Sequence, residues 1–505
     1  MARGNLSAKL LVTNRSALLA KYGAAGVNTV ERAVRALAAA DRRRGFDTRL
    51  IYLDGAALGR ARVADAGDPA ENKAAIDAVA KTHRPAYLVI LGSLDVVPYQ
   101  DLRNKLHDPA DPESDPDRFA FSDLPYACEA PYSQSVTKFL GPTRVVGRIP
   151  DLTGATRPTY LTRLLAASAA ARPLPRPESA FAISAKVWER STRMSVRNIL
   201  GGSSAVLVSP RSGPAFTKTQ LGGRIHFVNC HGNESDHTFS GEGPREKYFT
   251  AMDARKLAGV TRGTVAAFEC CYGAELYDPA GLPAPSIANT YLAEGAPGLV
   301  ASTTIAYGPA AGNANADLIC QFFLDQVLRG ASLGRAFLEA RLAYVRQQSV
   351  ADPYDEKTLA QFVLLGDPSI HPFVQEEADA GRRVAATGEV QAARQQRRVR
   401  LMKSGERLAR ETAYTVRATP AQSRNALKRK ALADARKRFP HVRVFEVREP
   451  AADRKVTGKA LAAMPRAREV FVAVRHLRDG ATPRLEGLLA YQVNGQLVEI
   501  DLLSH

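Results

Sequence analysis

The chain has 505 residues, of which 45% are hydrophobic and 24% are charged. This composition excludes an intrinsically disordered chain, and the length is sufficient for two or three domains with cores of their own. The formal net charge is +18 at pH 7, and most of the excess is C-terminal, because residues 376–505 hold about 27 basic and about 15 acidic side chains.

Neither a secretory signal nor a membrane span is expected. The first residues contain only a short apolar patch at Leu10, Leu11 and Val12, which is too short for the apolar region of a signal peptide. No later segment reaches the roughly 18 uninterrupted apolar residues that a membrane helix needs. We therefore predict a cytoplasmic protein without a membrane partner.

The cysteines are predicted to be free thiols. They are too few and too irregularly spaced for a disulfide framework, and no C-x-x-C pair indicates a zinc site. A reducing compartment would keep a nucleophilic thiol usable. The five are Cys128, Cys230, Cys270, Cys271 and Cys320.

Residues 1–172 are predicted to form an N-terminal α/β subdomain. Short apolar strands alternate with helices up to about Gly92, a pattern typical of a parallel sheet covered by helices. An Asp- and Pro-rich loop (His107–Arg118), a strand at TRVVGRIP and a helix from Ala155 to Ala171 follow. The proline-spaced segment ARPLPRPES then indicates a spacer and a domain boundary. The first strands are LLVTN, TRLIYLD and YLVILG, and the first helices are Asn28–Arg44 and Glu71–Thr82.

Residues 179–374 are predicted to form a second α/β subdomain. Several of its apolar runs stop abruptly at a polar or Gly-containing dipeptide, and catalytic groups of open α/β sheets lie at the carboxyl ends of strands. Two of those ends carry a His and a Cys. The strands are AFAISAKVW, RIHFVNCHG, TVAAFECCYG, GLVASTTIAYG and FVLLGDPSIHPF, and the helices are Ala314–Arg329 and Leu333–Gln347.

Residues 376–505 are predicted to form a small basic α+β domain. Two basic helices, Glu389–Ala413 and Gln422–Arg438, precede the strands HVRVFEV, EVFVAVRHL and GLLAYQVNGQLVEIDLL. The last of these indicates a hairpin turned at Asn494-Gly495, because Asn-Gly suits a type I′ turn.

His231 and Cys271 form the constellation with catalytic potential. A thiol is mostly protonated at neutral pH, so a cysteine nucleophile needs a nearby imidazole, and backbone N–H groups for the developing oxyanion. Each residue ends a buried strand and has glycine close behind it, Gly232 and Gly273, which lets a substrate approach the backbone. A lone His or Cys beside an apolar run is more often a core residue, but two in matching contexts favour catalysis.

These residues resemble the clan CD cysteine peptidases, which include caspases, metacaspases and legumain, and the gingipain family most of all. In that group one apolar strand ends in His-Gly and a later strand ends in a cysteine followed closely by glycine, as FVNCHGNES and AAFECCYGAELYDP do here. ILGSLDVVPYQDL, FSDLPYA, TRVVGRIPD and FVLLGDPSI extend the resemblance over roughly residues 1–374. It implies caspase-like α/β parallel-sheet sandwiches with helices on both faces, with the basic C-terminal domain as an appendage.

The resemblance implies a cysteine endopeptidase that acts through an acyl-enzyme. In metacaspases and gingipains the second cysteine of a pair is the nucleophile, which assigns Cys271 and leaves Cys270 as its buried neighbour; strand alternation is consistent with this. His231 would shuttle the proton, and the N–H groups of Cys271 and Gly232 would bind the oxyanion. No metal or organic cofactor is required, although structural calcium occurs in relatives.

The family sets specificity with the end of the strand opening the catalytic domain, here AKVWERS, and with the strand after the nucleophile, here ASTTIAYGP. Glu189 in the pocket would select Arg or Lys, because a carboxylate pairs with a guanidinium bidentately, whereas Lys186 would select Asp or Glu. We favour the basic preference, with Asp123 as a second acidic wall; the alternative is that both carboxylates are solvated surface charges. Ser302 and Tyr307 are further candidates for the pocket lining, although Tyr307 also suits a core aromatic.

Other interpretations stay open. His237 and His226 lie near the site in sequence and are alternative bases. The C-terminal Arg and Lys clusters could bind nucleic acid or an acidic partner, or they could be solvated helix faces. They could also be cleavage sites at which a protease activates a zymogen, and a regulatory protein is another possible activator. The fold could also be a catalytically silent scaffold whose basic domain does the binding.

Overall fold

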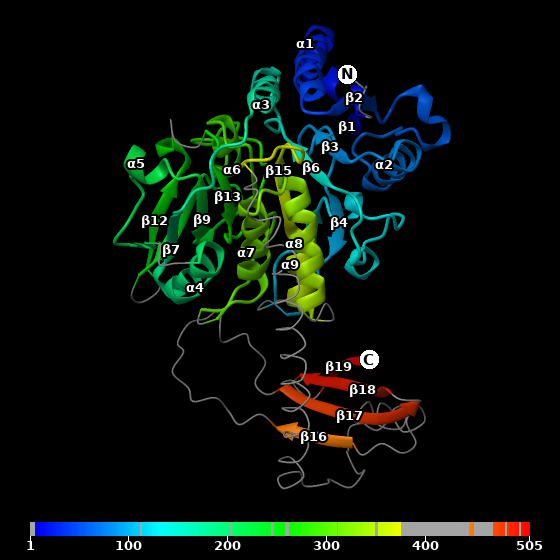
Figure 1. Ribbon diagram of the computed structural model, residues 1–505, viewed down its shortest axis with the longest axis vertical. Coiled ribbons are helices and arrows are strands. Elements are labelled where there is room, and N and C mark those ends of the chain that lie inside the picture. Colours follow the sequence, from blue (N-terminus) through cyan, green and yellow to red (C-terminus); the bar gives the residue numbers. More distant parts are fainter. Residues whose placement is uncertain are drawn as a thin grey trace. The chain divides into compact units, whose positions relative to one another are not determined.

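A computed structural model describes residues 6–111, 114–201, 205–243, 247–257, 262–310, 312–348 and 352–374, and the backbone of four strands between 444 and 504. The chain divides into two compact units, Met1–Glu376 and Glu377–His505, which are coloured blue to yellow and grey to red in Figure 1.

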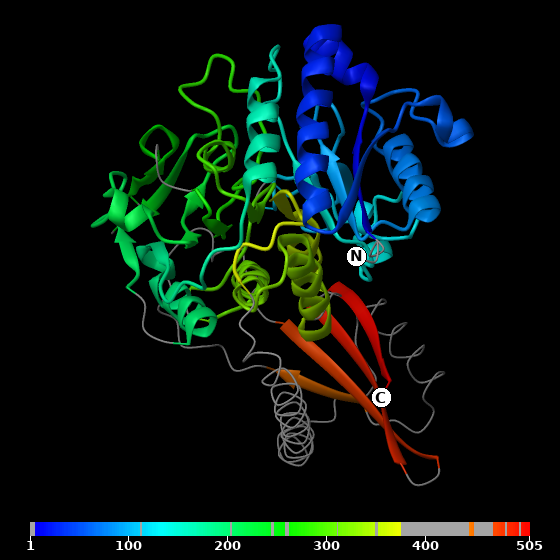
Figure 2. The ribbon, with the colours of Figure 1, turned by 45° about the horizontal axis from the view of Figure 1, so that its top comes forward.

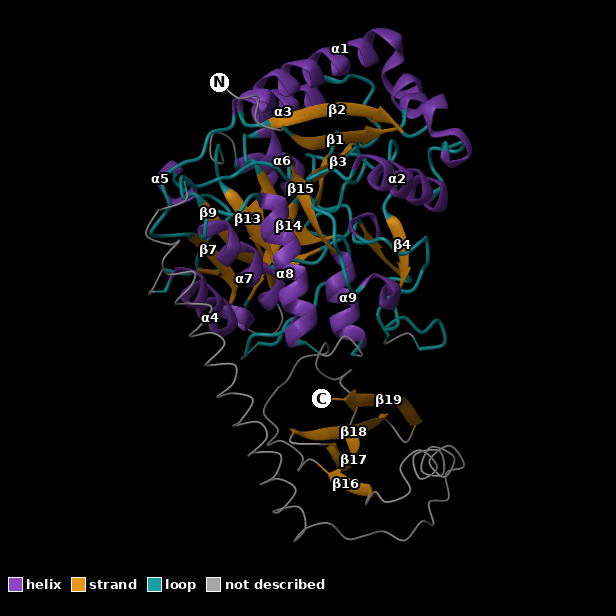
Figure 3. Cartoon of the chain, turned by 45° about the vertical axis from the view of Figure 1, so that its right-hand side comes forward, coloured by secondary structure: helices purple, strands orange, loops and turns teal. Residues whose placement is uncertain are grey.

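The first unit is built on one ten-stranded sheet with helices on both faces (Figures 1 and 3). This confirms the predicted α/β class. The strand order is β2-β1-β3-β6-β15-β14-β13-β9-β7-β8. The strands are β1 (Ser7–Thr13), β2 (Phe46–Tyr52), β3 (Tyr87–Leu91), β6 (Val146–Ile149), β7 (Phe181–Ala185), β8 (Leu207–Ser209), β9 (Ile225–Asn229), β13 (Val265–Phe268), β14 (Gly298–Ser302) and β15 (Phe362–Gly366).

Strand β15 joins two parallel halves of the sheet. It pairs in parallel with β6 and antiparallel with β14, so the strands from β14 to β8 run opposite to those from β2 to β15. The strands of both predicted α/β subdomains therefore lie in one sheet. The division at 172–179 stays a prediction.

The central strands are buried on both faces. In β13, Val265 and Ala267 pack into one core, while Ala266 and Phe268 pack into the other, as the two-residue period of a strand dictates. This explains why the sequence shows continuous apolar runs, which are typical of parallel strands covered on both sides.

Helices α1, α3 and α6 cover one face, and α4, α7, α8 and α9 cover the other; Figure 2 shows α1 and α3 side by side. The helices are α1 (Arg15–Arg43), α2 (Pro69–His83), α3 (Thr159–Ala170), α4 (Glu189–Leu200), α5 (Lys218–Leu221), α6 (Ile287–Ala293), α7 (Asn315–Leu328), α8 (Leu333–Gln347) and α9 (Pro353–Gln361).

Two small sheets complete the first unit. One is the hairpin of β4 (Gln100–Arg103) and β5 (Phe119–Ser122). The other is β10 (His231–Gly232), β11 (Thr238–Glu242) and β12 (Tyr248–Asp253), paired antiparallel. Both small sheets carry residues that matter for the site below.

A buried lysine anchors the end of the FVLLGDPSI motif. The Nζ atom of Lys9 on β1 lies 2.8 Å from Asp41 on α1 and 2.6 Å from Asp367, which follows β15. All three side chains are fully buried, and the lysine holds the pKa of Asp367 below its ordinary value. A buried charge is tolerated only when paired in this way.

The second unit contains a four-stranded antiparallel sheet, β16 (Val444–Arg448), β17 (Arg468–Asp479), β18 (Thr482–Val493) and β19 (Gln496–Ser504), in that order. Val493 pairs with Gln496, so β18 and β19 form the predicted hairpin. Its turn at 494–495 and the expected helices 389–413 and 422–438 lie outside the described residues. Within the described ranges, no helix combines the length and apolarity needed to cross a bilayer.

Candidate active site

The carboxyl ends of β9 and β13 lie side by side. The strands pair in parallel with Val228 opposite Phe268, so the residues that follow them, Cys230-His231-Gly232 and Glu269-Cys270-Cys271, leave the same edge of the sheet. The structure therefore brings the predicted base and nucleophile to one place.

The backbones of the two segments touch at Gly232. A Cβ atom built on Gly232 would lie 1.9 Å from the carbonyl oxygen of Cys271, a distance that no side chain can occupy. The backbone of Gly232 also acts on the thiol of Cys271, whose pKa it lowers. Glycine is required at position 232 because two segments of the backbone approach closely there, and not because of an unusual backbone conformation.

Only one of the paired cysteines is accessible. Cys270 is fully buried in the core with Phe268, whereas Cys271 is partly exposed. The Sγ atom of Cys271 lies 3.4 Å from the backbone nitrogen and 3.6 Å from the carbonyl oxygen of Ala306. Cys271 is therefore the cysteine of the pair that a substrate could reach, and its role as nucleophile stays a prediction.

His231 is held by three side chains. Its Nε2 lies 2.9 Å from Oε2 of Glu242 on β11, the strand that pairs with it. The ring of Trp188 lies 4.4 Å away between centroids, and the ring of Tyr248 meets it edge-on at 4.9 Å. Because a carboxylate oxygen accepts, Nε2 carries the proton and Nδ1 is the basic nitrogen.

The pair is neutral at rest. Burial lowers the pKa of His231, which the carboxylate of Glu242 partly offsets. Burial also raises the pKa of the Cys271 thiol, while the backbone of Ala306 and the charge of Lys357 act in the opposite direction. Near pH 7 these directions favour the neutral thiol of Cys271 and the neutral imidazole of His231.

The residue after Cys271 has a strained backbone. Tyr272 has a φ of 55°, a left-handed conformation that is rare for an aromatic residue and is found where the surroundings enforce it. Its N–H donates to the carbonyl of Thr304 at 3.0 Å, and its hydroxyl donates to Asp117 at 2.7 Å. Asp117 belongs to the 104–118 loop between β4 and β5.

Asp117 and its neighbour Asp115 also hold the segment that follows β14. Asp117 accepts from the N–H of Ile305 at 2.8 Å, and Asp115 accepts from the hydroxyl of Tyr307 at 2.8 Å. Both carboxylates bind the buried ammonium of Lys357. The predicted pocket residue Tyr307 therefore lies beside Ala306, which contacts the nucleophile.

Lys186 and Glu189 flank Trp188, whose ring contacts His231, in the chain. The Glu189 carboxylate binds Lys186 and, at 2.9 Å, Arg193 one turn along α4. These cations lower the pKa of Glu189. A substrate guanidinium would have to displace them.

Two other predicted pocket residues are engaged inside the protein. Asp123 is 3% exposed and binds the buried guanidinium of Arg148 through both oxygens, at 2.6 and 2.9 Å. Ser302 is fully buried and donates to the carbonyl of Thr304 at 2.8 Å, which shapes the turn after β14. A direct role in substrate binding stays a prediction for both, and their contacts favour structural roles.

The alternative bases have other partners. His226 is fully buried between the hydroxyl of Tyr291 and the carbonyl of Leu221, and burial lowers its pKa to about 4. His237 lies 3.7 Å from Asp236 and 4.0 Å from Asp253. These surroundings favour His231 as the base.

Sequence reasoning missed three contributors to the site: Glu242, Trp188 and Asp117. Glu242 follows the His-Gly pair by ten positions in a segment that returns antiparallel to it, and an acidic residue on a short polar strand after His-Gly is the signal that could have found it. Asp117 comes from the other half of the sheet, and the Asp- and Pro-rich composition of its loop does not point to a partner.

Among known proteins, the part of the chain that carries this site is similar to a class of clan CD cysteine peptidases. Residues 216–373 match Peptidase family C25, the gingipain family, and the match includes both His231 and Cys271. It confirms the resemblance that the two strand-end motifs indicated.

Two crystal structures of the Saccharomyces cerevisiae separase–securin complex are among the solved structures that align with this chain. Their sequence identities are 13% and 12% and their TM-scores 0.29 and 0.30. Each alignment covers 46% of this chain and 14% of the matched chain, so this chain spans only a small part of that length. The comparison with curated proteins finds no match.

We predict that Cys271 titrates as a buried thiol. Its rate of alkylation by iodoacetamide, followed by peptide mass spectrometry, should rise with pH and reach half its maximum above about pH 8.5, the ordinary value for cysteine. An alkylation rate already maximal at pH 6 would instead indicate a resting thiolate–imidazolium pair and contradict the neutral site.

Proposed function

We propose that the chain is a cysteine endopeptidase in which Cys271 is the nucleophile and His231 the general base. The observation that carries the proposal is the contact between Gly232 and Cys271, which places the residues after β9 and β13 together at one edge of the sheet. The similarity of residues 216–373 to Peptidase family C25 supports the same chemistry.

In the proposed acylation step, Nδ1 of His231 takes the thiol proton and Sγ of Cys271 attacks the scissile carbonyl. The Glu242 carboxylate stabilises the imidazolium that forms, because it already accepts from Nε2. The imidazolium then protonates the leaving amine. Water, activated by the same imidazole, hydrolyses the thioester and restores the thiol.

Backbone donors would stabilise the oxyanion. We assign this role to the N–H groups of Gly232 and Cys271. The N–H of Gly232 already faces the thiol, so a carbonyl attacked by that sulfur would lie within reach of it. Donors fixed before the reaction need no reorganisation when the charge develops.

For specificity we propose Arg or Lys at the residue before the cleaved bond, with Glu189 as the acidic wall. Lys186 and Arg193 occupy that carboxylate at rest, so a substrate cation would take their place. We also propose that proteolytic processing or a protein partner activates the enzyme, which would work in the reducing cytoplasm.

The activity is tested under reducing conditions with fluorogenic peptides that end in Arg, Lys, Asp or Leu. We expect cleavage that vanishes in Cys271→Ala and persists in Cys270→Ala, because Cys270 faces the core. Each protein is measured with and without limited proteolysis, which tests activation. Cleavage that survives in Cys271→Ala would disprove the nucleophile, and silence in every condition would favour a scaffold.

Gly232→Ala tests the oxyanion site. The new Cβ would push the Gly232 strand away from Cys271, and we expect kcat/KM to fall about 100-fold or more, as for loss of one oxyanion donor. Gly141→Ala is the matched control, since nothing lies within 4 Å of a Cβ there. Equal activity of both variants, at equal melting temperature, would remove Gly232 from the mechanism.

Glu189→Gln tests the pocket. If Glu189 binds the substrate cation, kcat/KM for the Arg peptide should fall about 10-fold or more relative to the Leu peptide, because a charged bidentate pair is lost. Lys186→Gln is its counterpart: selective loss of cleavage after Asp in that variant would assign the pocket to Lys186 instead.

A further inference from the structure

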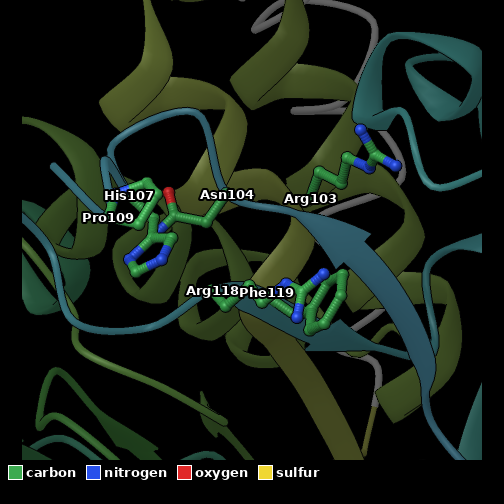
Figure 4. Close-up of a pocket in the computed structure, with 6 residues that line it drawn as sticks. All are labelled: Arg103, Asn104, His107, Pro109, Arg118 and Phe119. Carbon is green, nitrogen blue, oxygen red and sulfur yellow. The ribbon is translucent and has the colours of Figure 1, made fainter.

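A basic hollow of about 440 Å³ lies beside the β4–β5 hairpin, outside the catalytic site (Figure 4). Its walls come from the ends of the two strands and from the loop that connects them. They are Arg103, Asn104, His107, Pro109, Arg118 and Phe119.

The cations of the hollow are not neutralised by carboxylates. Arg103 donates to the neutral side chain of Gln134 at 3.0 Å, and the guanidinium of Arg118 lies over the ring of Phe119 at 5.1 Å. Neither arginine has an ion pair in the described part of the chain, and both are exposed. Among the described residues that line the hollow, none is acidic.

Two carboxylates of the hairpin, those of Asp101 and Asp108, are engaged in other contacts. Asp101 accepts from Tyr132 at 2.9 Å and from Gln134 at 2.5 Å. Asp108 accepts from the N–H of Ala110 at 2.9 Å. The positive charge of the two arginines is therefore available to a ligand.

Two walls of the hollow connect to the nucleophile through hydrogen bonds. Asn104 donates to the carbonyl of Asp117 at 2.7 Å, and Nδ1 of His107 donates to the carbonyl of Asp115 at 2.8 Å, since a carbonyl only accepts. The carboxylate of Asp117 accepts from the hydroxyl of Tyr272, which follows Cys271, and the carboxylate of Asp115 accepts from the hydroxyl of Tyr307.

The second branch of this connection reaches the sulfur itself. Asp117 and Asp115 fix Ile305 and Tyr307, and Ala306 between them contacts Sγ of Cys271 through its N–H. A ligand that fixes the ends of the 104–118 loop would thus fix both segments that contact Cys271, Tyr272 and Ala306.

We propose that this hollow binds a small multivalent anion, carrying two or more phosphate or carboxylate groups, and that binding stabilises the arrangement around Cys271. Two guanidinium groups and an imidazole match such a ligand, because Arg binds phosphate and carboxylate through paired hydrogen bonds. A nucleic acid strand would need a longer groove with several stacking aromatics, and among the described lining residues Phe119 is the one Phe, Tyr or Trp.

The binding half of the proposal does not depend on peptidase activity. Calorimetric titration of the full chain with inorganic pyrophosphate and with citrate, at constant ionic strength, should give saturable binding. Arg103→Gln/Arg118→Gln should weaken it about 10-fold or more, and Arg60→Gln, a surface arginine outside the hollow, should not. Preference for pyrophosphate or citrate distinguishes phosphate from carboxylate ligands. Absence of binding, or equal binding in the double variant, overturns the site.

The coupling half rests on the role of Cys271 in the proposed function, and its readout is chosen to be independent of catalysis. Saturating anion should change the alkylation rate of Cys271 by iodoacetamide about threefold or more, and this change should be absent in the double variant. Binding with an unchanged alkylation rate would overturn the coupling. A chain that binds the anion and changes its alkylation rate but cleaves no peptide would contradict the peptidase proposal alone.

Discussion

The close contact between Gly232 and Cys271 is the constraint on which the site depends. It exists because β9 and β13 are neighbours in a parallel sheet and end at the same level. The two segments that follow these strands therefore leave the sheet into one narrow space. The same contact excludes every side chain from position 232 and points its N–H at the thiol. The geometry of the candidate site here follows from strand register.

Burial sets the protonation of the pair. The site removes water from both Cys271 and His231, which disfavours their charged forms. Glu242 partly restores the charged form of His231, and Ala306 and Lys357 partly restore that of Cys271. The proposed enzyme would therefore transfer the proton when substrate arrives, and the supporting residues come from three separate elements of the fold.

The two halves of the sheet meet in the site as well as in the core. Strand β15 lies between β6 and β14, and the 104–118 loop of the first half supplies the carboxylates that position Tyr272 and Tyr307 next to the nucleophile. The N-terminal half thus contributes contacts to the candidate site as well as support for the sheet.

Local patterns predicted what depends on local sequence. Helix α8 has the predicted bounds, because its apolar period is regular and Ser332 caps it. Helix α1 begins 13 residues before the predicted start. Its first half contains Gly23, which has a φ of 66°, and the sequence there resembles a helix break, so the first half was not predicted. Glu242 escaped prediction because its contact with His231 depends on the antiparallel return of β11. Asp117 escaped prediction because its partner Tyr272 is distant in sequence, and the partner of Asp123, Arg148, lies on β6.

The central claim is that Cys271, activated by His231, attacks a peptide carbonyl, and covalent trapping tests it most directly. The protein is incubated with peptidyl acyloxymethyl ketones that carry Arg, Lys, Asp or Leu, and the adduct is located by peptide mass spectrometry. The account predicts one adduct per chain, on Cys271, formed about 100-fold more slowly in His231→Ala. An adduct on another cysteine, or a rate that does not depend on His231, would contradict it.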